Sequence, residues 1–118
     1  MDKDLVSGIY SKMKGVWLKK HSYVYIAASG SYDAFVIDVS GFNNGYLLDM
    51  RFYVSMFGKK VTRDNNGINT MVGFYWKDDN QGICIEVPDN IYLFVGVSYK
   101  NNIRLGYTLE SGYTLQLF

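Results

Sequence analysis

Residues 46–57, which read YLLDMRFYVSMF, decide the fold, because apolar and polar side chains alternate along nearly the whole run. A period of two residues sends successive side chains to opposite faces of a β-strand, whereas a helix would mix the two sets. Residues 33–40, DAFVIDVS, repeat the pattern over a shorter length. Both runs therefore predict strands. The apolar face of the longer run holds Leu48, Met50, Phe52, Val54 and Met56.

Turn-forming residues punctuate the chain on both sides of these runs, because Asn, Asp and Gly tolerate the positive φ that tight hairpin turns need. They gather, with Ser and Pro, at 29–31, 41–45, 64–67, 78–82, 88–90, 100–102 and 111–112. Strands are expected between them near 16–27, 33–40, 46–57, 68–77, 83–87, 91–99, 103–109 and 113–117, with 58–67 either a hairpin or one long loop. Eight or nine short strands predict an all-β fold, an antiparallel β-sandwich of jelly-roll-like type, with a small closed barrel as the alternative.

The chain of 118 residues has the length of a single domain. Its aromatic content of 17% also favours sheet. The first fifteen residues differ from the rest, because Leu5, Ile9 and Met13 recur every four residues, as on one side of an amphipathic helix. We therefore expect a lead-in or stem segment over residues 1–15 and one β-sandwich domain over 16–118.

Charge and hydropathy exclude several classes of function. The formal net charge is +1, so the chain lacks the positive field that a nucleic-acid binder needs. It has no apolar stretch of about 18 residues, so membrane insertion is not expected. The sequence as given opens with Met1-Asp2-Lys3-Asp4 and shows no signal peptide.

Few residues of the chain are candidates for catalysis or metal binding. His21 is the only histidine, and Cys84, the only cysteine, lies between Ile83 and Ile85, where a buried and inert thiol is expected. One His and one Cys do not make a zinc site, and the oxygen-rich turns at 64–66 and 78–80 lack the alternating ligand spacing of a calcium loop. The sequence therefore predicts no enzyme, no metal and no cofactor.

Aromatic residues next to polar loops are the candidates for recognition, because a tyrosine or tryptophan face suits the apolar side of a sugar and amides suit its hydroxyls. The alternative for each aromatic is that it caps the core. We expect Trp76→Ala to abolish ligand binding and leave the fold intact, and loss of folding would instead place Trp76 in the core. The candidate ligand-binding residues are Trp76, Asp78, Asp79, Asn80, Gln81, Tyr99, Lys100, Asn101 and Asn102.

Several predicted strands are apolar on both faces. Val24 and Ile26 alternate with Tyr23 and Tyr25, and residues 92–95 read YLFV. A two-layer monomer needs only one apolar face for each sheet, so the excess predicts that outer faces are also buried, as in a homo-oligomer.

Four stretches resemble the carboxy-terminal receptor-binding tip domain of tailed-phage tail fibres. They are Trp17-Leu18-Lys19-Lys20, the run from Tyr32 to Phe42, Phe52-Tyr53-Val54-Ser55, and Val72-Gly73-Phe74-Tyr75-Trp76. The resemblance covers roughly residues 15–118 and implies a compact β-sandwich, a homotrimer and a virion location at the fibre tip. It also implies binding of a host cell-surface glycan or protein.

Other classes of function also fit these residues. A monomeric carbohydrate-binding module or lectin domain would be extracellular and would need no second copy to fold. A virion structural or decoration protein would bind no sugar.

Overall fold

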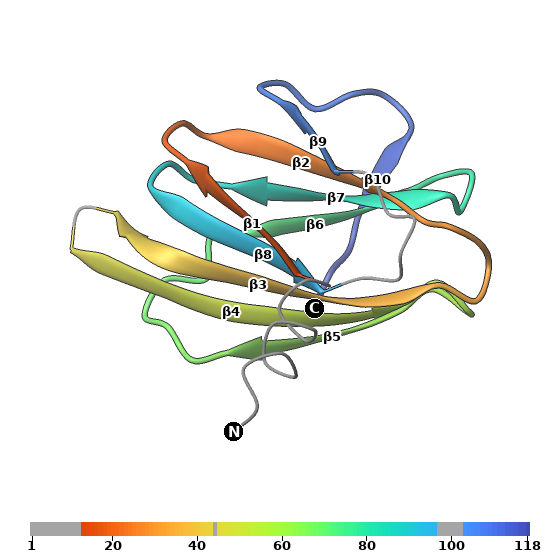
Figure 1. The fold of residues 1–118 in the computed structure, drawn as a ribbon, viewed down its shortest axis with the longest axis horizontal. Coiled ribbons are helices and arrows are strands. Elements are labelled where there is room, and N and C mark those ends of the chain that lie inside the picture. The colour runs from red at the N-terminus through yellow and green to blue at the C-terminus, as the bar shows by residue number, and fades with distance from the viewer. Residues whose placement is uncertain (1–12, 44, 97–102) are drawn as a thin grey trace, which may run out of the picture.

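Two antiparallel sheets of five strands each pack against one another and form a β-sandwich (Figure 1). The computed structural model describes residues 13–43, 45–96 and 103–118. Sheet A has the order β1(Met13–Leu18), β8(Ile91–Gly96), β3(Ala34–Asn43), β4(Tyr46–Ser55), β5(Lys60–Asn65). Sheet B has the order β10(Tyr113–Leu115), β6(Gly73–Lys77), β7(Gly82–Val87), β2(Ser22–Ala27), β9(Ile103–Gly106). The predicted antiparallel β-sandwich is confirmed.

The largest difference from the predicted strands lies at residues 16–27, which form two strands in different sheets. Leu18 ends β1 in sheet A and Ser22 begins β2 in sheet B, and both are buried. The exposed residues Lys19, Lys20 and His21 carry the chain from one sheet to the other. Three consecutive polar residues break the alternation, which is the sequence signal for the turn.

The other differences concern element boundaries. Residues 58–67 contain β5, which makes a hairpin with β4 through residues 56–59. The strand predicted over 68–77 occupies only 73–77. Residues 13–15 of the predicted lead-in segment belong to β1 and pair with β8, while Leu5 and Ile9 of the helical pattern lie outside the described residues.

The core forms where the alternating apolar residues of the two sheets meet. The rings of Phe52 from sheet A and Phe74 from sheet B lie 5.4 Å apart, and each is fully buried. Phe118 extends this cluster, with its ring 5.9 Å from that of Phe52 and 6.3 Å from that of Phe74. The Arg63 guanidinium lies 4.5 Å from the Phe118 ring. Full burial of a phenylalanine side chain such as Phe52 or Phe74 stabilises the folded state by roughly 1.5–3 kcal/mol.

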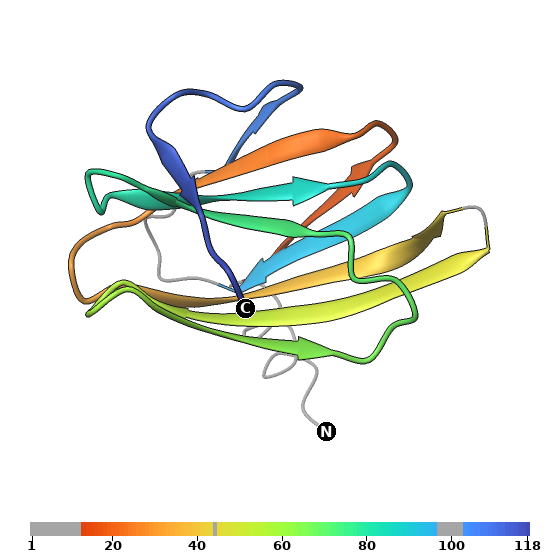
Figure 2. The same cartoon turned by 180° about the vertical axis from the view of Figure 1, so that it is seen from behind.

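Three connections gather at one end of the sandwich, on the right of Figure 1 and the left of Figure 2. They are residues 28–33 between β2 and β3, residues 56–59 between β4 and β5, and residues 78–81 between β6 and β7. We call them the loop end. Strand β8 finishes and strand β9 starts at this end, because Gly96 pairs with Val36 and Ile103 pairs with Ile26. In the part of the chain that the structure describes, no helix has the length and hydropathy of a membrane span.

Candidate recognition site at the loop end

The turn at residues 78–81 lies at the loop end with four polar side chains exposed, namely Asp78, Asp79, Asn80 and Gln81. Asn80 has a φ of 63° and donates its backbone N–H to the Lys77 carbonyl over 3.0 Å. Asp79 accepts a hydrogen bond from the Gln81 N–H at 3.0 Å and lies 3.3 Å from the Lys77 ammonium. Asn tolerates the left-handed conformation better than most residues, so the turn is well defined.

Asp78 links this turn to the last strand of the sheet. Its carboxylate accepts the Thr114 hydroxyl hydrogen at 2.6 Å, and its backbone N–H donates to the Gly112 carbonyl at 2.9 Å. These two bonds attach the turn to the segment at residues 112–114, and the turn presents two carboxylates and two amides to solvent.

Trp76 does not belong to this surface. Its side chain is only 6% exposed, its ring packs edge-on against Phe74 at 5.2 Å, and its Nε1–H donates to Gln116 Oε1 at 2.6 Å. The alternation along β6 explains the placement, because Phe74 and Trp76 share a parity and both point inward. The ring cannot stack on a ligand from this position, so Trp76 is corrected from a binding residue to a core residue.

Four of the predicted site residues, Tyr99, Lys100, Asn101 and Asn102, lie outside the described residues. The strands that flank them, β8 and β9, meet the loop end at Gly96 and Ile103. That residues 100–102 share one end of the sandwich with residues 78–82 stays a prediction.

Two exposed aromatic residues at the loop end, Tyr32 and Phe57, were not among the candidate ligand-binding residues. Tyr32 is 81% exposed and Phe57 is 60% exposed, and their rings stack with centroids 5.2 Å apart and planes inclined by 15°. Phe57 continues the alternating run at 46–57, and its position next to Gly58 was the available signal that it faces a turn. Exposed aromatic surface is unfavourable in water, so this pair is the candidate contact surface at the loop end.

Asp33 holds the loop that displays Tyr32. Its Oδ2 accepts the Ser29 N–H at 2.8 Å and its Oδ1 accepts the Ala34 N–H at 3.0 Å. Its backbone carbonyl accepts the Met56 N–H at 2.9 Å, which ties the loop to the β4–β5 turn. The residue is 6% exposed, so these bonds are largely shielded from water.

The β4–β5 turn holds Phe57 in place by an unusual backbone conformation. Gly58 has a φ of 75°, which suits glycine, and Lys59 follows with a φ of 51°. A left-handed conformation costs a lysine about 1 kcal/mol or more.

The 28–33 loop also contacts the 78–81 turn, because the Ala28 N–H donates to the Gln81 carbonyl at 2.8 Å. The aromatic pair and the polar turn are thus parts of one connected end.

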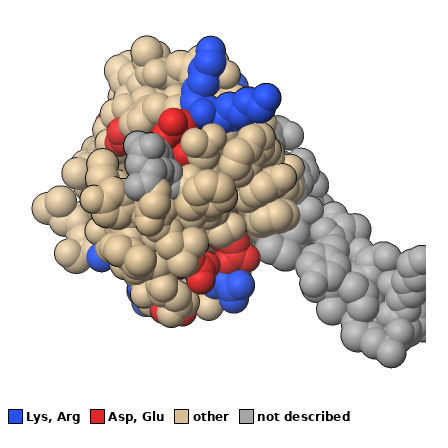
Figure 3. All heavy atoms as spheres, turned by 90° about the vertical axis from the view of Figure 1, so that its left-hand side faces the viewer, with Lys and Arg blue, Asp and Glu red and all other residues tan. Residues whose placement is uncertain are grey.

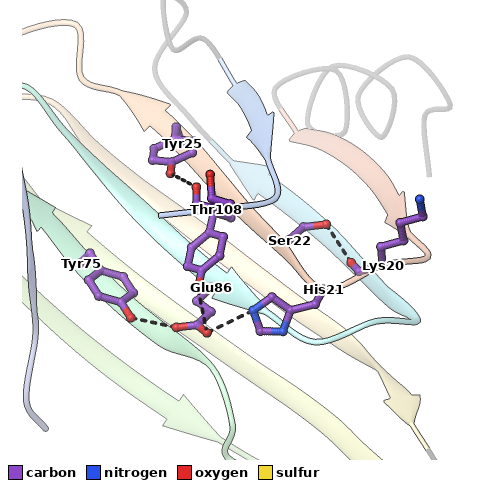
Figure 4. Close-up of polar contacts among 8 residues, drawn as sticks. Lys20, His21, Ser22, Tyr25, Tyr75, Glu86 and Thr108 are labelled. Carbon is purple, nitrogen blue, oxygen red and sulfur yellow. Dashed lines mark hydrogen bonds and ion pairs between the residues drawn. The ribbon is translucent and has the colours of Figure 1, made fainter. Parts of the chain in front are cut away.

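A second polar cluster lies on the outer face of sheet B and centres on Glu86 (Figure 4). Its carboxylate accepts the Tyr75 hydroxyl hydrogen at 2.8 Å and the Tyr23 hydroxyl hydrogen at 3.3 Å, and it lies 3.1 Å from His21 Nε2. Burial, together with the hydrogen bond and negative charge of Glu86, raises the pKa of Tyr75 to about 12. The donors come from β2, β6 and the turn before β2, so the cluster cross-links neighbouring strands.

Tyr25 and Cys84 lie beside this cluster under the segment that follows β9. The Tyr25 hydroxyl donates to the Thr108 carbonyl at 2.8 Å and accepts the Glu110 N–H at 2.9 Å (Figure 4). Arg104 pairs with Glu110 and lies 4.4 Å from the Tyr25 ring centre. Cys84 is fully buried, as predicted, and burial raises the pKa of its thiol to about 12. A nucleophilic thiolate is therefore disfavoured here.

Charged side chains on the opposite end of the sandwich are distributed around its margins. Lys and Arg side chains lie at the upper edge and toward the bottom of the view in Figure 3, and the centre is formed by other residues. Within residues 13–43, 45–96 and 103–118 there is no group of three His, Cys, Asp or Glu residues placed to hold a metal ion.

Comparison with protein-family models, curated proteins and solved structures finds no match to this chain.

Proposed function

We propose that this domain is a non-catalytic recognition module that binds a cell-surface glycan through its loop end. The observation that carries the proposal is the stacked pair Tyr32 and Phe57, which remain 81% and 60% exposed beside a turn of carboxylates and amides. The apolar face of a sugar ring packs on an exposed aromatic surface, and Asp79, Asn80 and Gln81 supply acceptors and donors for its hydroxyls.

The exposure of the carboxylates at the loop end suits binding better than chemistry. A glycosidase needs two carboxyl groups facing a ring that is held away from water. Here Asp78 and Asp79 are both exposed, and each already accepts a hydrogen bond from within the protein. An open platform of this kind gives weak binding at each site, and repeated copies on one assembly raise the overall affinity by avidity.

The specific form of the proposal is the trimeric tip of a phage tail fibre, located on the virion and attaching to a host surface. Its supports are the sequence resemblance and the β-sandwich fold. A monomeric carbohydrate-binding module shares the proposed site and differs from the fibre tip in its mass in solution.

A glycan array tests the proposal. The labelled domain is applied to lipopolysaccharide, capsule and wall-polymer oligosaccharides, next to Tyr32→Ala and Tyr46→Ala. Tyr46 is an exposed aromatic at the opposite end of the sandwich, so Tyr46→Ala is the matched control. We expect the wild type and Tyr46→Ala to bind the same glycans. The affinity of Tyr32→Ala for these glycans should be lower by roughly tenfold or more, a loss of about 1.4 kcal/mol in binding free energy. An array without hits, or equal binding by Tyr32→Ala, would contradict the proposal.

A further inference from the structure

The connection between β9 and β10 joins the two opposite edges of sheet B. In the strand order, β9 lies at one edge and β10 at the other, with β2, β7 and β6 between them. Residues 107–112 therefore pass from edge to edge, and Figure 2 shows this connection in blue. We call residues 107–113 the strap, which includes Tyr113, the first residue of β10.

Tyr25 of β2 fastens the strap to the outer face of sheet B. Its side chain points outward, because it alternates along β2 with residues of the core. Its hydroxyl donates to the Thr108 carbonyl at 2.8 Å and accepts the Glu110 N–H at 2.9 Å. Its ring also meets the Tyr113 ring edge-on, with the centroids 5.2 Å apart. One side chain therefore makes two hydrogen bonds to the strap backbone and one ring contact with its last residue.

The strap is itself exposed, but it covers buried side chains. Residues 107–112 are exposed and Tyr113 is half-buried, whereas Tyr25 is 3% exposed and Cys84 is fully buried. Strands β6 and β7 separate β10 from β2, so the two tyrosine rings meet above them, and Cys84 of β7 lies directly opposite Tyr25. A segment that buries little of its own surface opens at a lower free energy than the core does.

The other features of the strap favour movement. Gly106 precedes it, and Gly112 near its far end has a φ of 88°. Glycine adopts many backbone conformations without steric cost, so both positions suit a hinge. The ion pair between Arg104 and Glu110 is exposed on both sides, and a pair of this kind adds little stability.

The far end of the strap is attached to the candidate recognition site. The Gly112 carbonyl accepts the Asp78 N–H at 2.9 Å, and Asp78 begins the turn at residues 78–81. The hydroxyl of Thr114, just after the strap, donates to the Asp78 carboxylate at 2.6 Å. Movement of the strap at Gly112 therefore breaks one of these two attachments of the turn.

We propose that the strap opens as a unit while the sandwich stays folded, that the Tyr25 hydroxyl is its latch, and that opening loosens the 78–81 turn. The latch thereby regulates how firmly one part of the loop end is held. The bearing on recognition rests on the proposed function, but the opening itself does not. The closed strap covers Cys84, the only thiol of the chain, and the open strap exposes it.

The reaction of Cys84 with the chromogenic disulfide DTNB at about pH 8 tests the latch. The reaction needs an accessible thiolate, so its rate follows the population of the open strap. Tyr25→Phe keeps the ring and removes both hydrogen bonds to the strap, and we expect Cys84 to react roughly tenfold faster or more. Tyr23→Phe is the matched control, because the Tyr23 hydroxyl bonds to Glu86 on the same face and not to the strap. It should react at the wild-type rate.

Two results of this experiment would overturn the proposal. One is an equal rate in Tyr25→Phe and Tyr23→Phe. The other is a rate that rises with urea as steeply as global unfolding does, because opening of the strap alone exposes little surface.

Hydrogen exchange of the Asp78 amide tests the attachment to the turn. In Tyr25→Phe this amide keeps its acceptor, the Gly112 carbonyl, so its exchange rate changes only if the strap moves at Gly112. We expect the Asp78 amide to exchange roughly tenfold faster in Tyr25→Phe than in Tyr23→Phe. Equal exchange in the two variants would overturn the link between strap and turn, whatever the glycan array shows.

Discussion

The backbone carbonyl of Asp33 accepts a hydrogen bond from the backbone N–H of Met56 over 2.9 Å, and this bond joins the two segments that display the exposed aromatic pair. Tyr32 precedes the acceptor and Phe57 follows the donor. The distance between the two rings is therefore set by the backbone and not by the side chains alone.

Asp33→Ala tests whether this loop is held by the carboxylate. The variant leaves the N–H groups of Ser29 and Ala34 without their acceptor, so we expect a loss of about 1–3 kcal/mol in the free energy of unfolding. Asp33→Asn keeps one acceptor oxygen and should lose less. Urea unfolding followed by circular dichroism measures both, and equal stability of Asp33→Ala and the wild type would show that the carboxylate is not needed.

Lys59→Gly should stabilise the domain. Lys59 has a φ of 51°, a conformation that glycine adopts without the steric cost a side chain brings. We expect the free energy of unfolding to rise by roughly 0.5–1 kcal/mol, after allowing for the greater freedom of glycine in the unfolded chain. Lys59→Ala removes the same charge, keeps the strain and should give no gain. A destabilised Lys59→Gly would mean that the lysine side chain supports the turn.

We expect Trp76→Ala to lower the free energy of unfolding and not to remove a ligand contact. The side chain is buried against Phe74, so its loss leaves a cavity that costs about 3–5 kcal/mol. Trp76→Phe refills most of the space and loses the hydrogen bond to Gln116, so its effect should be smaller. Thermal unfolding measures the series, and wild-type stability of Trp76→Ala would return the residue to the candidate site.

We expect alkaline pH to lower the free energy of unfolding, because Tyr75 and Cys84 on the outer face of sheet B lose their protons. The pKa values of Tyr75 and Cys84 are raised to about 12, chiefly by burial, from the ordinary values of 10.0 and 9.0 for these side chains. The unfolded state releases these protons first, so the stability they contribute is complete below pH 9 and is lost as the pH rises toward 12. Circular dichroism with tyrosinate absorbance measures this loss. Titration of every tyrosine near pH 10 in the folded protein would contradict it.

Much of the fold followed from the sequence because alternation is a local property. The run at 46–57 predicted β4, whose inward set is buried from Leu48 to Val54. The crossing from β1 to β2 was missed because both strands are apolar and only three residues separate them. A one-dimensional pattern does not show which sheet a strand joins, since that depends on pairing with β8, more than seventy residues away.

The candidate site was predicted only in part for a related reason. Residues 78–81 were found because turn chemistry is local. Trp76 was misplaced because its aromatic character was weighed above its parity with Phe74. Tyr32 and Phe57 are 25 positions apart, and the pairing of β3 with β4, continued by the hydrogen bond between Asp33 and Met56, brings their segments together.

Backbone amide chemical shifts, recorded by NMR while a glycan that binds on the array is added, test the recognition site most directly. We expect the chemical-shift changes to cluster in residues 29–33, 56–59 and 78–81, and we expect Tyr32→Ala to remove them. Shifts confined to the opposite end, at residues 19–21 and 88–90, or to the Glu86 cluster on sheet B, would contradict it.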